Sequence, residues 1–142
     1  AVEMAGLSGS IVVYAIEQKE EAVFLIGRNK EQFGLPNLHV VNGKAPEALE
    51  TLPVPTHAFI GGSSGQLREI LDCLYKKNPQ MRIVLNAISL ETISELKEIL
   101  TQFRVTEEEV VQVQVNRMKP VGSYHLMQAE NPVWICSFRF QE

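Results

Sequence analysis

The order of apolar and amphipathic segments constrains the fold more than any other feature of this sequence. Short β-branched runs, typical of covered strands, alternate with segments whose apolar residues recur at helical spacing. The predicted strands are Ile11–Ile16, Leu38–Val41, Thr56–Ile60 and Arg82–Ala87. The predicted helices are Ala1–Gly6, Glu20–Phe33, Pro46–Leu52, Ser64–Lys77 and a segment that starts at Ser89 or Thr92 and reaches Phe103. This alternation predicts an α/β fold with a mostly parallel sheet.

The pattern changes toward the end of the sequence. Val110–Val115 alternates apolar and polar residues, which is the period of a strand in an antiparallel pair. We expect Lys119–Asn131 to be a loop and Pro132–Phe140 to be the partner strand. The sequence therefore predicts one domain, residues 1–142, whose parallel sheet ends in an antiparallel hairpin.

Composition and charge exclude several classes of function. Of 142 residues, 45% are hydrophobic, and 17 acidic against 13 basic residues give a net charge of −4. The basic residues are scattered, and no apolar run approaches the ~18–20 residues that span a bilayer. We therefore expect neither nucleic acid nor a membrane as a partner. Cys73 and Cys136 are far apart in apolar surroundings, so we expect two free thiols and a reducing cytoplasm.

Residues suited to a nucleoside follow the first two predicted strands. Glu17 stands at the carboxyl end of the first, where open α/β sheets bind ligands, and its carboxylate can accept hydrogen bonds from both ribose hydroxyls. A solvated loop glutamate is an equally good interpretation, and an acid here also serves dinucleotides. After the second strand, Gly43, Lys44 and Ala45 form a turn against which an adenine can lie, although an ordinary strand–helix turn explains them as well.

A loop of small residues follows the third predicted strand. Gly61, Gly62, Ser63, Ser64 and Gly65 precede a helix and offer free amides to a carboxylate or a sulfonium substituent. No Gly-Lys-Ser/Thr follows, so this is not a phosphate-binding P-loop. The alternative is a helix-capping turn, for which one glycine is enough.

Ser64 and Gly65 of this loop suit a substrate, and so do two further places. Asn86 is expected in the loop after the Arg82–Leu85 part of the fourth strand, where its amide either positions a substrate or shapes a turn. The segment that joins the two hairpin strands suits an anionic substrate, although a solvated loop is the alternative; its polar residues are Arg117, Lys119, Ser123, Tyr124 and His125. No residues stand at metal-binding spacing.

Taken together, several segments resemble one enzyme family. They are YAIE (Tyr14–Glu17), NGKAPEAL (Asn42–Leu49), HAFIGGSSGQLREIL (His57–Leu71), RIVLNAISLET (Arg82–Thr92) and NRMKPVGSYHLMQAENPVWI (Asn116–Ile135). They look like the decarboxylating precorrin-6Y C5,15-methyltransferases, either the separate CbiT-type subunit or the C-terminal half of the fused enzyme. The likeness covers nearly the whole sequence in the right order.

The resemblance implies a Rossmann-like, S-adenosylmethionine-dependent methyltransferase fold. It implies methylation of carbon 15 of a (cobalt-)precorrin with loss of the ring-C acetate carboxylate, in cobalamin biosynthesis. Glu17 matches the family's ribose-binding acid, Ala45 its backbone contact to adenine, and the loop from Gly61 to Gly65 the border of the cleft. It also implies a homo-oligomer and a carbon-5 methyltransferase domain or subunit as partner. It assigns no catalytic side chain.

The sequence departs from the family at its start. The family's first strand and glycine-rich loop should precede Ala1–Gly6, and they are missing. We therefore expect a fragment in which Ile11–Ile16 and Thr56–Ile60 lack their shared neighbour, and which is inactive by itself. Two other interpretations remain open, an NAD-dependent oxidoreductase and a non-catalytic oligomerisation or binding module.

Overall fold

The computed structural model describes residues 1–63 and 65–141. Its contacts divide the chain into two compact units, Ala1–Leu52 and Pro53–Glu142. We call them unit 1 and unit 2.

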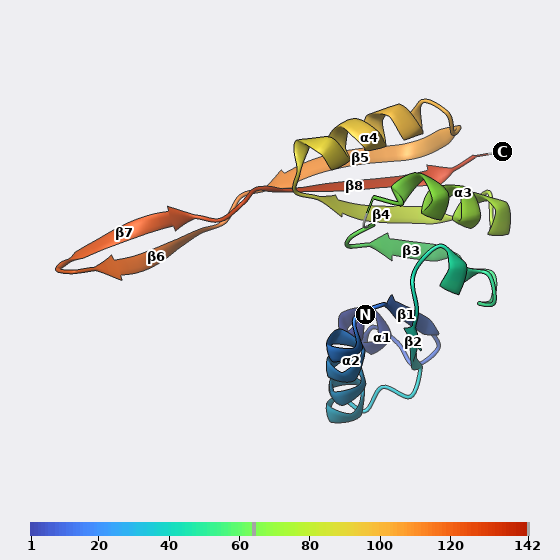
Figure 1. Cartoon of the computed structure of the whole chain (residues 1–142), viewed down its shortest axis with the longest axis horizontal. Helices are drawn as coiled ribbons and strands as arrows, with labels where there is room; N and C mark the ends of the chain where they lie inside the picture. Colours follow the sequence, from blue (N-terminus) through green and yellow to red (C-terminus); the bar gives the residue numbers. More distant parts are fainter. Residues whose placement is uncertain (64, 142) are drawn as a thin grey trace. The chain divides into compact units, whose positions relative to one another are not determined.

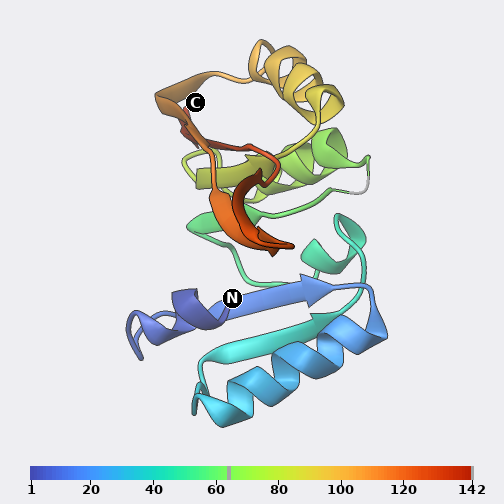
Figure 2. The same ribbon diagram turned by 90° about the vertical axis from the view of Figure 1, so that its left-hand side faces the viewer.

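Unit 1 is built around one parallel strand pair with its crossover helix. Its elements are α1 (Val2–Gly6), β1 (Val13–Glu17), α2 (Glu20–Gln32), β2 (Leu38–Asn42) and the 3₁₀ turn η1 (Glu47–Leu49). The strands pair in register from Val13 opposite Leu38 to Glu17 opposite Asn42. Figure 2 shows α2 lying along this pair. The parallel register brings the carboxyl ends of β1 and β2 to the same edge.

The core of unit 1 is small, and the side chain of Asn37 binds the backbone next to it. Ala5, Val13, Ala15 and Leu38 are buried together. Asn37 Nδ2 donates hydrogen bonds to the carbonyl oxygens of Ala5 (2.9 Å), Ser8 (3.2 Å) and Ile11 (2.8 Å). These bonds fix the path from α1 into β1.

The first strand is shorter and less covered than its composition predicts. It begins at Val13, where pairing with β2 starts. The preceding residues Ile11 and Val12 are exposed. Tyr14 is also exposed, and its ring stacks on that of His39 with centroids 5.0 Å apart. Among the described residues, the apolar run is therefore buried on one face only.

Unit 2 contains a four-stranded mixed sheet. It comprises β3 (His57–Ile60), α3 (Leu67–Lys77), β4 (Arg82–Ala87), α4 (Leu90–Leu100), β5 (Val105–Val113), β6 (Asn116–Val121), β7 (Tyr124–Ala129) and β8 (Val133–Phe140). The strand order is β3-β4-β8-β5. β3 and β4 are parallel, whereas β8 runs antiparallel to both β4 and β5. The predicted antiparallel partnership of the last strands is confirmed.

The two helices of unit 2 cover one face of its sheet (Figures 1 and 2). Helix α3 buries the predicted stripe of Leu67, Ile70, Leu71 and Leu74. Alternate strand residues such as Ile83, Leu85, Cys136 and Phe138 are buried, as expected for a sheet with one covered face. Ser89 caps α4 by accepting a hydrogen bond from the Thr92 amide.

The predicted loop at Lys119–Asn131 is wrong. Most of it belongs to a second hairpin, in which β6 and β7 pair antiparallel from Asn116 opposite Ala129 to Val121 opposite Tyr124. A two-residue turn, Gly122-Ser123, connects them, and Gly122 takes a positive φ of 60°. Such turns favour glycine because it enters this region without strain. Figure 1 shows the hairpin standing out from unit 2 as an arm.

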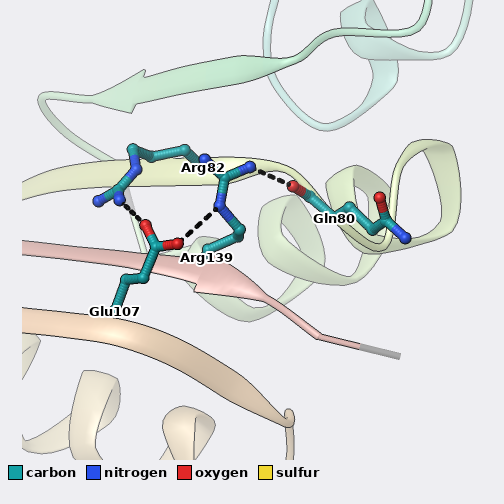
Figure 3. A network of polar contacts seen from close by, with 4 residues as sticks. All are labelled: Gln80, Arg82, Glu107 and Arg139. Carbon is teal, nitrogen blue, oxygen red and sulfur yellow. Dashed lines mark hydrogen bonds and ion pairs between the residues drawn. The ribbon is translucent and has the colours of Figure 1, made fainter.

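A charged cluster connects β4, β5 and β8 at the end of the four-stranded sheet that lies away from the β6–β7 arm (Figure 3). Glu107, at a β-bulge in β5, accepts a hydrogen bond from Arg82 and lies 3.5 Å from Arg139 Nε. Arg139 Nη1 also donates to the Gln80 carbonyl oxygen at 3.1 Å. Glu107 has a φ of 52°, which is uncommon for a residue other than glycine. The two guanidinium groups hold this residue at the irregularity of the strand.

Among the described residues, β1 pairs with β2 alone and β3 pairs with β4 alone. That a strand missing from this sequence is their shared neighbour stays a prediction. In the part of the chain that the structure describes, no helix is long and apolar enough to cross a membrane.

Candidate cofactor site

Glu17 ends β1 and is half buried. Its Oε1 accepts hydrogen bonds from the backbone amides of Gln18 and Lys19, each at 2.9 Å. These bonds hold the carboxylate at the strand end, directly before α2. A carboxylate fixed in this way is preorganised to accept hydrogen bonds from the hydroxyl groups of a ligand.

The turn after β2 lies beside Glu17. The Gly43 amide donates to the Glu17 carbonyl oxygen at 3.0 Å, so the two strand ends are joined by their backbones. A Cβ on Gly43 would lie 3.0 Å from the Ala48 Cβ, so a side chain here would be crowded and glycine is favoured. Lys44 is exposed and Ala45 is half buried. The structure thus brings together Glu17, Gly43, Lys44 and Ala45, all named from the sequence.

The expected helix at Pro46–Leu52 is only a single 3₁₀ turn. It spans Glu47–Leu49, and Pro46 occupies its N-cap position. The Lys44 carbonyl oxygen accepts from the Ala48 amide at 2.9 Å. This contact closes the turn immediately after the Gly43–Ala45 segment.

In unit 2, the glycine-rich loop follows β3 as predicted. Gly61 and Gly62 are exposed and Ser63 is half buried, and the Gln66 amide donates to the Ser63 carbonyl oxygen at 2.9 Å. Gly65 has a φ of 77°, so this position favours glycine. Among described atoms, a Cβ on Gly62 would meet nothing within 4 Å. The loop backbone is therefore open to close approach.

The helix after this loop starts later than expected. It begins at Leu67, and its N-cap residue Gln66 makes no side-chain capping bond. Ser64, predicted to cap the helix and to bind substrate, lies outside the described residues.

Asn86 does not lie in a loop, which corrects the prediction. It is inside β4, paired with Ile135 of β8, because the antiparallel partner extends the strand to Ala87. Asn86 is half buried, and it alternates with the buried Leu85 and Ala87.

Arg117, Tyr124 and His125 are all exposed strand residues of the β6–β7 arm. Arg117 forms an ion pair with Glu130 at the base of the arm. Within unit 2, the tip of the arm lies away from the end of β3 that leads into Gly61 (Figure 1). The structure therefore does not bring Tyr124 or His125 next to the glycine-rich loop of their own sheet.

The hairpin turn of the arm escaped the sequence prediction. Gly122-Ser123 between Val121 and Tyr124 is a two-residue hairpin signal that would have predicted the arm. Lys119, on that arm, forms no ion pair with any described residue, unlike Arg117.

The remaining reactive groups do not form a second site. Both cysteines are free thiols. Burial, and to a lesser extent Glu108, raise the pKa of Cys136 from 9.0 to about 11, so it stays protonated. In the described residues, no group of three or more His, Cys, Asp or Glu side chains is placed to hold a metal ion.

The residues present fit S-adenosylmethionine. A ribose diol needs an acceptor such as the Glu17 carboxylate, and an adenine needs a half-buried apolar contact with backbone groups nearby, as at Ala45. Taken by itself, Gly62 of unit 2 is exposed and leaves its backbone open to close approach.

Comparison with known proteins places this arrangement in a family. The model of the precorrin methyltransferase domain matches residues 1–139. A probable cobalt-precorrin-6B C(15)-methyltransferase (decarboxylating) from Pyrobaculum calidifontis is 37% identical over 124 residues, covering 87% of this chain. The chain spans 63% of the length of that relative.

Solved structures agree in fold. A precorrin-6y C5,15-methyltransferase from Geobacter metallireducens has a TM-score of 0.86 and 33% identity over 99% of this chain and 72% of that chain. A SAM-dependent O-methyltransferase from Thermotoga maritima has a TM-score of 0.73 at 17% identity, over 96% of this chain and 52% of that one, and shows the fold alone. The chain thus has the α/β fold of S-adenosylmethionine-dependent methyltransferases and belongs to the precorrin methyltransferase family.

Proposed function

We propose that the protein of which this chain forms at least a part transfers a methyl group from S-adenosylmethionine to carbon 15 of a (cobalt-)precorrin. The reaction is coupled to loss of carbon dioxide from the ring-C acetate and belongs to cobalamin biosynthesis. The observation that carries the proposal is the Glu17 carboxylate, held by two amides beside the Gly43 turn, in a member of the precorrin methyltransferase family. The names of the relatives support the substrate and the decarboxylation.

The cofactor roles follow from the two strand ends of unit 1 and the loop of unit 2. Glu17 accepts the ribose hydroxyl groups, and Gly43, Lys44 and Ala45 border the adenine. In unit 2, Gly61, Gly62 and Ser63 are the residues that we propose for contact with the methionine end, from their sequence motif. The support is the joined backbone of Glu17 and Gly43 and the open space above Gly62.

The chemistry needs little from side chains. The cofactor supplies an electrophilic methyl group, and the tetrapyrrole supplies a nucleophilic carbon. Holding these about 3 Å apart and aligned supplies a large share of the rate by proximity. We assign no catalytic acid or base.

Substrate contacts are proposed at Gly65, Asn86, Arg117, Tyr124 and His125; Ser64 stays a sequence-based prediction. Arg117 and Tyr124 suit the carboxylates of a precorrin because a guanidinium and a phenol donate hydrogen bonds to such groups.

The setting of the reaction is also a proposal. We infer a cytoplasmic homo-oligomer that works with a carbon-5 methyltransferase domain or subunit. The double position in the name of the Geobacter relative, C5,15, supports the second activity. The exposed β6–β7 arm supports self-association, because an isolated two-stranded hairpin is only marginally stable in water.

Calorimetry on the full-length protein tests the proposed function. S-adenosylhomocysteine should bind and NAD should not. Glu17→Ala should weaken S-adenosylhomocysteine binding by roughly 1–3 kcal/mol, the cost of removing a buried hydrogen-bond partner. Glu21→Ala is the matched control, since Glu21 is an exposed acid in the first turn of α2. Binding of NAD alone would contradict the proposal.

A further inference from the structure

The carboxyl ends of β1 and β2 place two polar side chains next to each other. The strands run parallel and end side by side (Figure 2), and their last register partners are Glu17 and Asn42. Neighbouring strands lie about 4.7–4.9 Å apart, and register partners project their side chains to the same face of the sheet. The carboxylate of Glu17 and the amide of Asn42 therefore leave the strand ends together, on one face of unit 1.

The Glu17 carboxylate has one filled oxygen and one open oxygen. Its Oε1 accepts hydrogen bonds from the amides of Gln18 and Lys19, each at 2.9 Å. A carboxylate offers about four lone-pair sites on its two oxygens, so these two amides fill Oε1. No hydrogen bond from a described residue reaches Oε2. A ligand therefore meets Oε2, which accepts hydrogen bonds and donates none.

An acceptor alone satisfies only half of a ribose hydroxyl group. A hydroxyl group carries an O–H donor and also lone pairs that accept hydrogen bonds. Oε2 can accept the O–H donors of the ribose, but it leaves the hydroxyl oxygens without a donor. An acceptor that loses its water without gaining a partner costs free energy. A donor beside Oε2 would remove this cost.

Asn42 is the donor that stands at this place. It is exposed at the end of β2, and its side-chain amide forms no hydrogen bond with any described residue. Asn37, just before the other end of β2, differs in this respect, because its amide donates to three carbonyl oxygens of the fold. The amide of Asn37 is used by the structure, whereas that of Asn42 is left for a ligand.

The charge of Glu17 explains why an amide suits position 42. An acid there would place like charges opposite each other on neighbouring strands, which is destabilising. A lysine or arginine would form an ion pair with Glu17 and occupy Oε2 in place of the ligand. An amide donates hydrogen bonds without repelling the carboxylate or neutralising it. Asparagine therefore keeps Oε2 open while it adds the missing donor.

We propose that Asn42 binds the ribose of S-adenosylmethionine: its Nδ2 donates to the oxygen of a ribose hydroxyl group whose own O–H donates to Glu17 Oε2. The inference rests on the proposed function. Asn42 and Glu17 then hold the same hydroxyl group from both of its sides. Loss of that hydroxyl group leaves both side chains without a partner, so the pair selects a ribose against a deoxyribose.

The first test measures the coupling between Asn42 and the ribose in the full-length protein. Calorimetry gives the Kd of S-adenosylhomocysteine and of its 2′-deoxy and 3′-deoxy analogues, for the unmutated protein and for Asn42→Ala. The variant should bind S-adenosylhomocysteine roughly threefold to tenfold more weakly, because one hydrogen bond is lost. The affinity penalty for removing one of the two hydroxyl groups should shrink by a similar factor, because its contact with Asn42 is already gone.

The result that overturns the proposal is an uncoupled loss. If Asn42 only supports the turn, Asn42→Ala weakens all three ligands by the same factor, and both deoxy penalties stay as in the unmutated protein. Asn29→Ala is the matched control, since Asn29 is an exposed asparagine of the same unit, and it should change no Kd. Circular dichroism checks the fold of each variant.

The second test replaces the donor by an acceptor of nearly the same shape. Asn42→Asp removes the N–H donors and sets a negative charge opposite Glu17. It should bind S-adenosylhomocysteine more weakly than Asn42→Ala does. Binding of Asn42→Asp as tight as that of the unmutated protein would contradict the role of Asn42 as a donor.

A failure of the proposed function would look different. Absence of S-adenosylhomocysteine binding in the unmutated protein would remove the methyltransferase assignment, and this inference with it. Normal S-adenosylhomocysteine binding together with unchanged deoxy penalties in Asn42→Ala would remove the inference alone.

Discussion

Two side chains, those of Glu17 and Asn37, shape the part of unit 1 that we propose binds the nucleoside. Glu17 is where the sequence predicts it, because a polar residue after an apolar run identifies a strand end without further information. Asn37 was not predicted, since its role depends on three carbonyl groups that lie far from it in sequence. A side chain that hydrogen-bonds to backbone atoms far from it in the sequence produces no periodic pattern in that sequence.

Asn37→Ala should lower the free energy of unfolding by about 0.5–1.5 kcal/mol, because the half-buried hydrogen bond to the Ala5 carbonyl oxygen is lost together with the exposed bonds to Ser8 and Ile11. Urea titration followed by circular dichroism measures the change. Asn29→Ala, at an exposed position of α2, is the control and should be neutral or slightly stabilising. Equal stability of the two variants would refute the role of Asn37.

Cys136 should be unreactive in the folded protein. With a pKa of about 11, it exists as thiolate to only about 0.1% at pH 8. In a Cys73→Ser variant, an aromatic disulfide reagent should therefore modify Cys136 only after denaturant is added, as absorbance of the released thiolate shows. Rapid labelling without denaturant would contradict its burial.

The same thiol gives a dependence of stability on pH. The folded state holds the Cys136 proton more tightly than the unfolded state, whose pKa is near 9.0. Its contribution is complete below pH 9.0 and is lost as the pH rises toward about 11. Cys136→Ala should flatten the decline of urea midpoint over this range, whereas Cys73→Ala should not.

At the scale of elements, the strands and helices of the parallel part follow from their periodic patterns, whereas the strands of the β6–β7 arm do not. The stripe of Leu67, Ile70, Leu71 and Leu74 fixes α3 by its period alone. The arm has no such period, because both of its faces are exposed and hydrophobic alternation is lost. Its only local signal is the turn at Gly122, a residue at positive φ.

The two methionines that pair across the β6–β7 arm, Met118 and Met127, should control self-association. Met118→Glu combined with Met127→Glu places two negative charges on each copy, on the face of the arm that they share, so sedimentation velocity should show a smaller species than wild type. Gln128→Glu, on the other face of the arm, adds one charge to the same hairpin and should leave the mass unchanged. An unaltered mass for the double variant would mean that the arm does not join copies.

At the scale of the whole molecule, the family could be predicted while the pairing of strands needed the structure. The quoted motifs were enough to identify the precorrin methyltransferase family. Which strands lie side by side depends on contacts between distant segments, such as β8 between β4 and β5. Asn86 shows the consequence, since only its pairing with Ile135 makes it a strand residue.

Hydrogen exchange should report the open strand edges in the chain of residues 1–142. The amides of β3 that face away from β4 have no sheet partner among the described residues, so they should exchange faster than those of β4, which is paired on both sides. Exchange measured by nuclear magnetic resonance gives the comparison residue by residue. Equal protection of the two strands would mean that another segment covers the β3 edge.

The backbone bond between Gly43 and Glu17 has a consequence for how such enzymes diversify. The acid, the turn and the helix between them belong to one β–α–β unit, Val13 to Leu49, and its register is set internally. Recombination that exchanges this stretch between related enzymes therefore transfers the residues that we propose bind the nucleoside together, in one segment. Preference for the methyl acceptor, which we assign to other parts of the chain, is then free to evolve on its own.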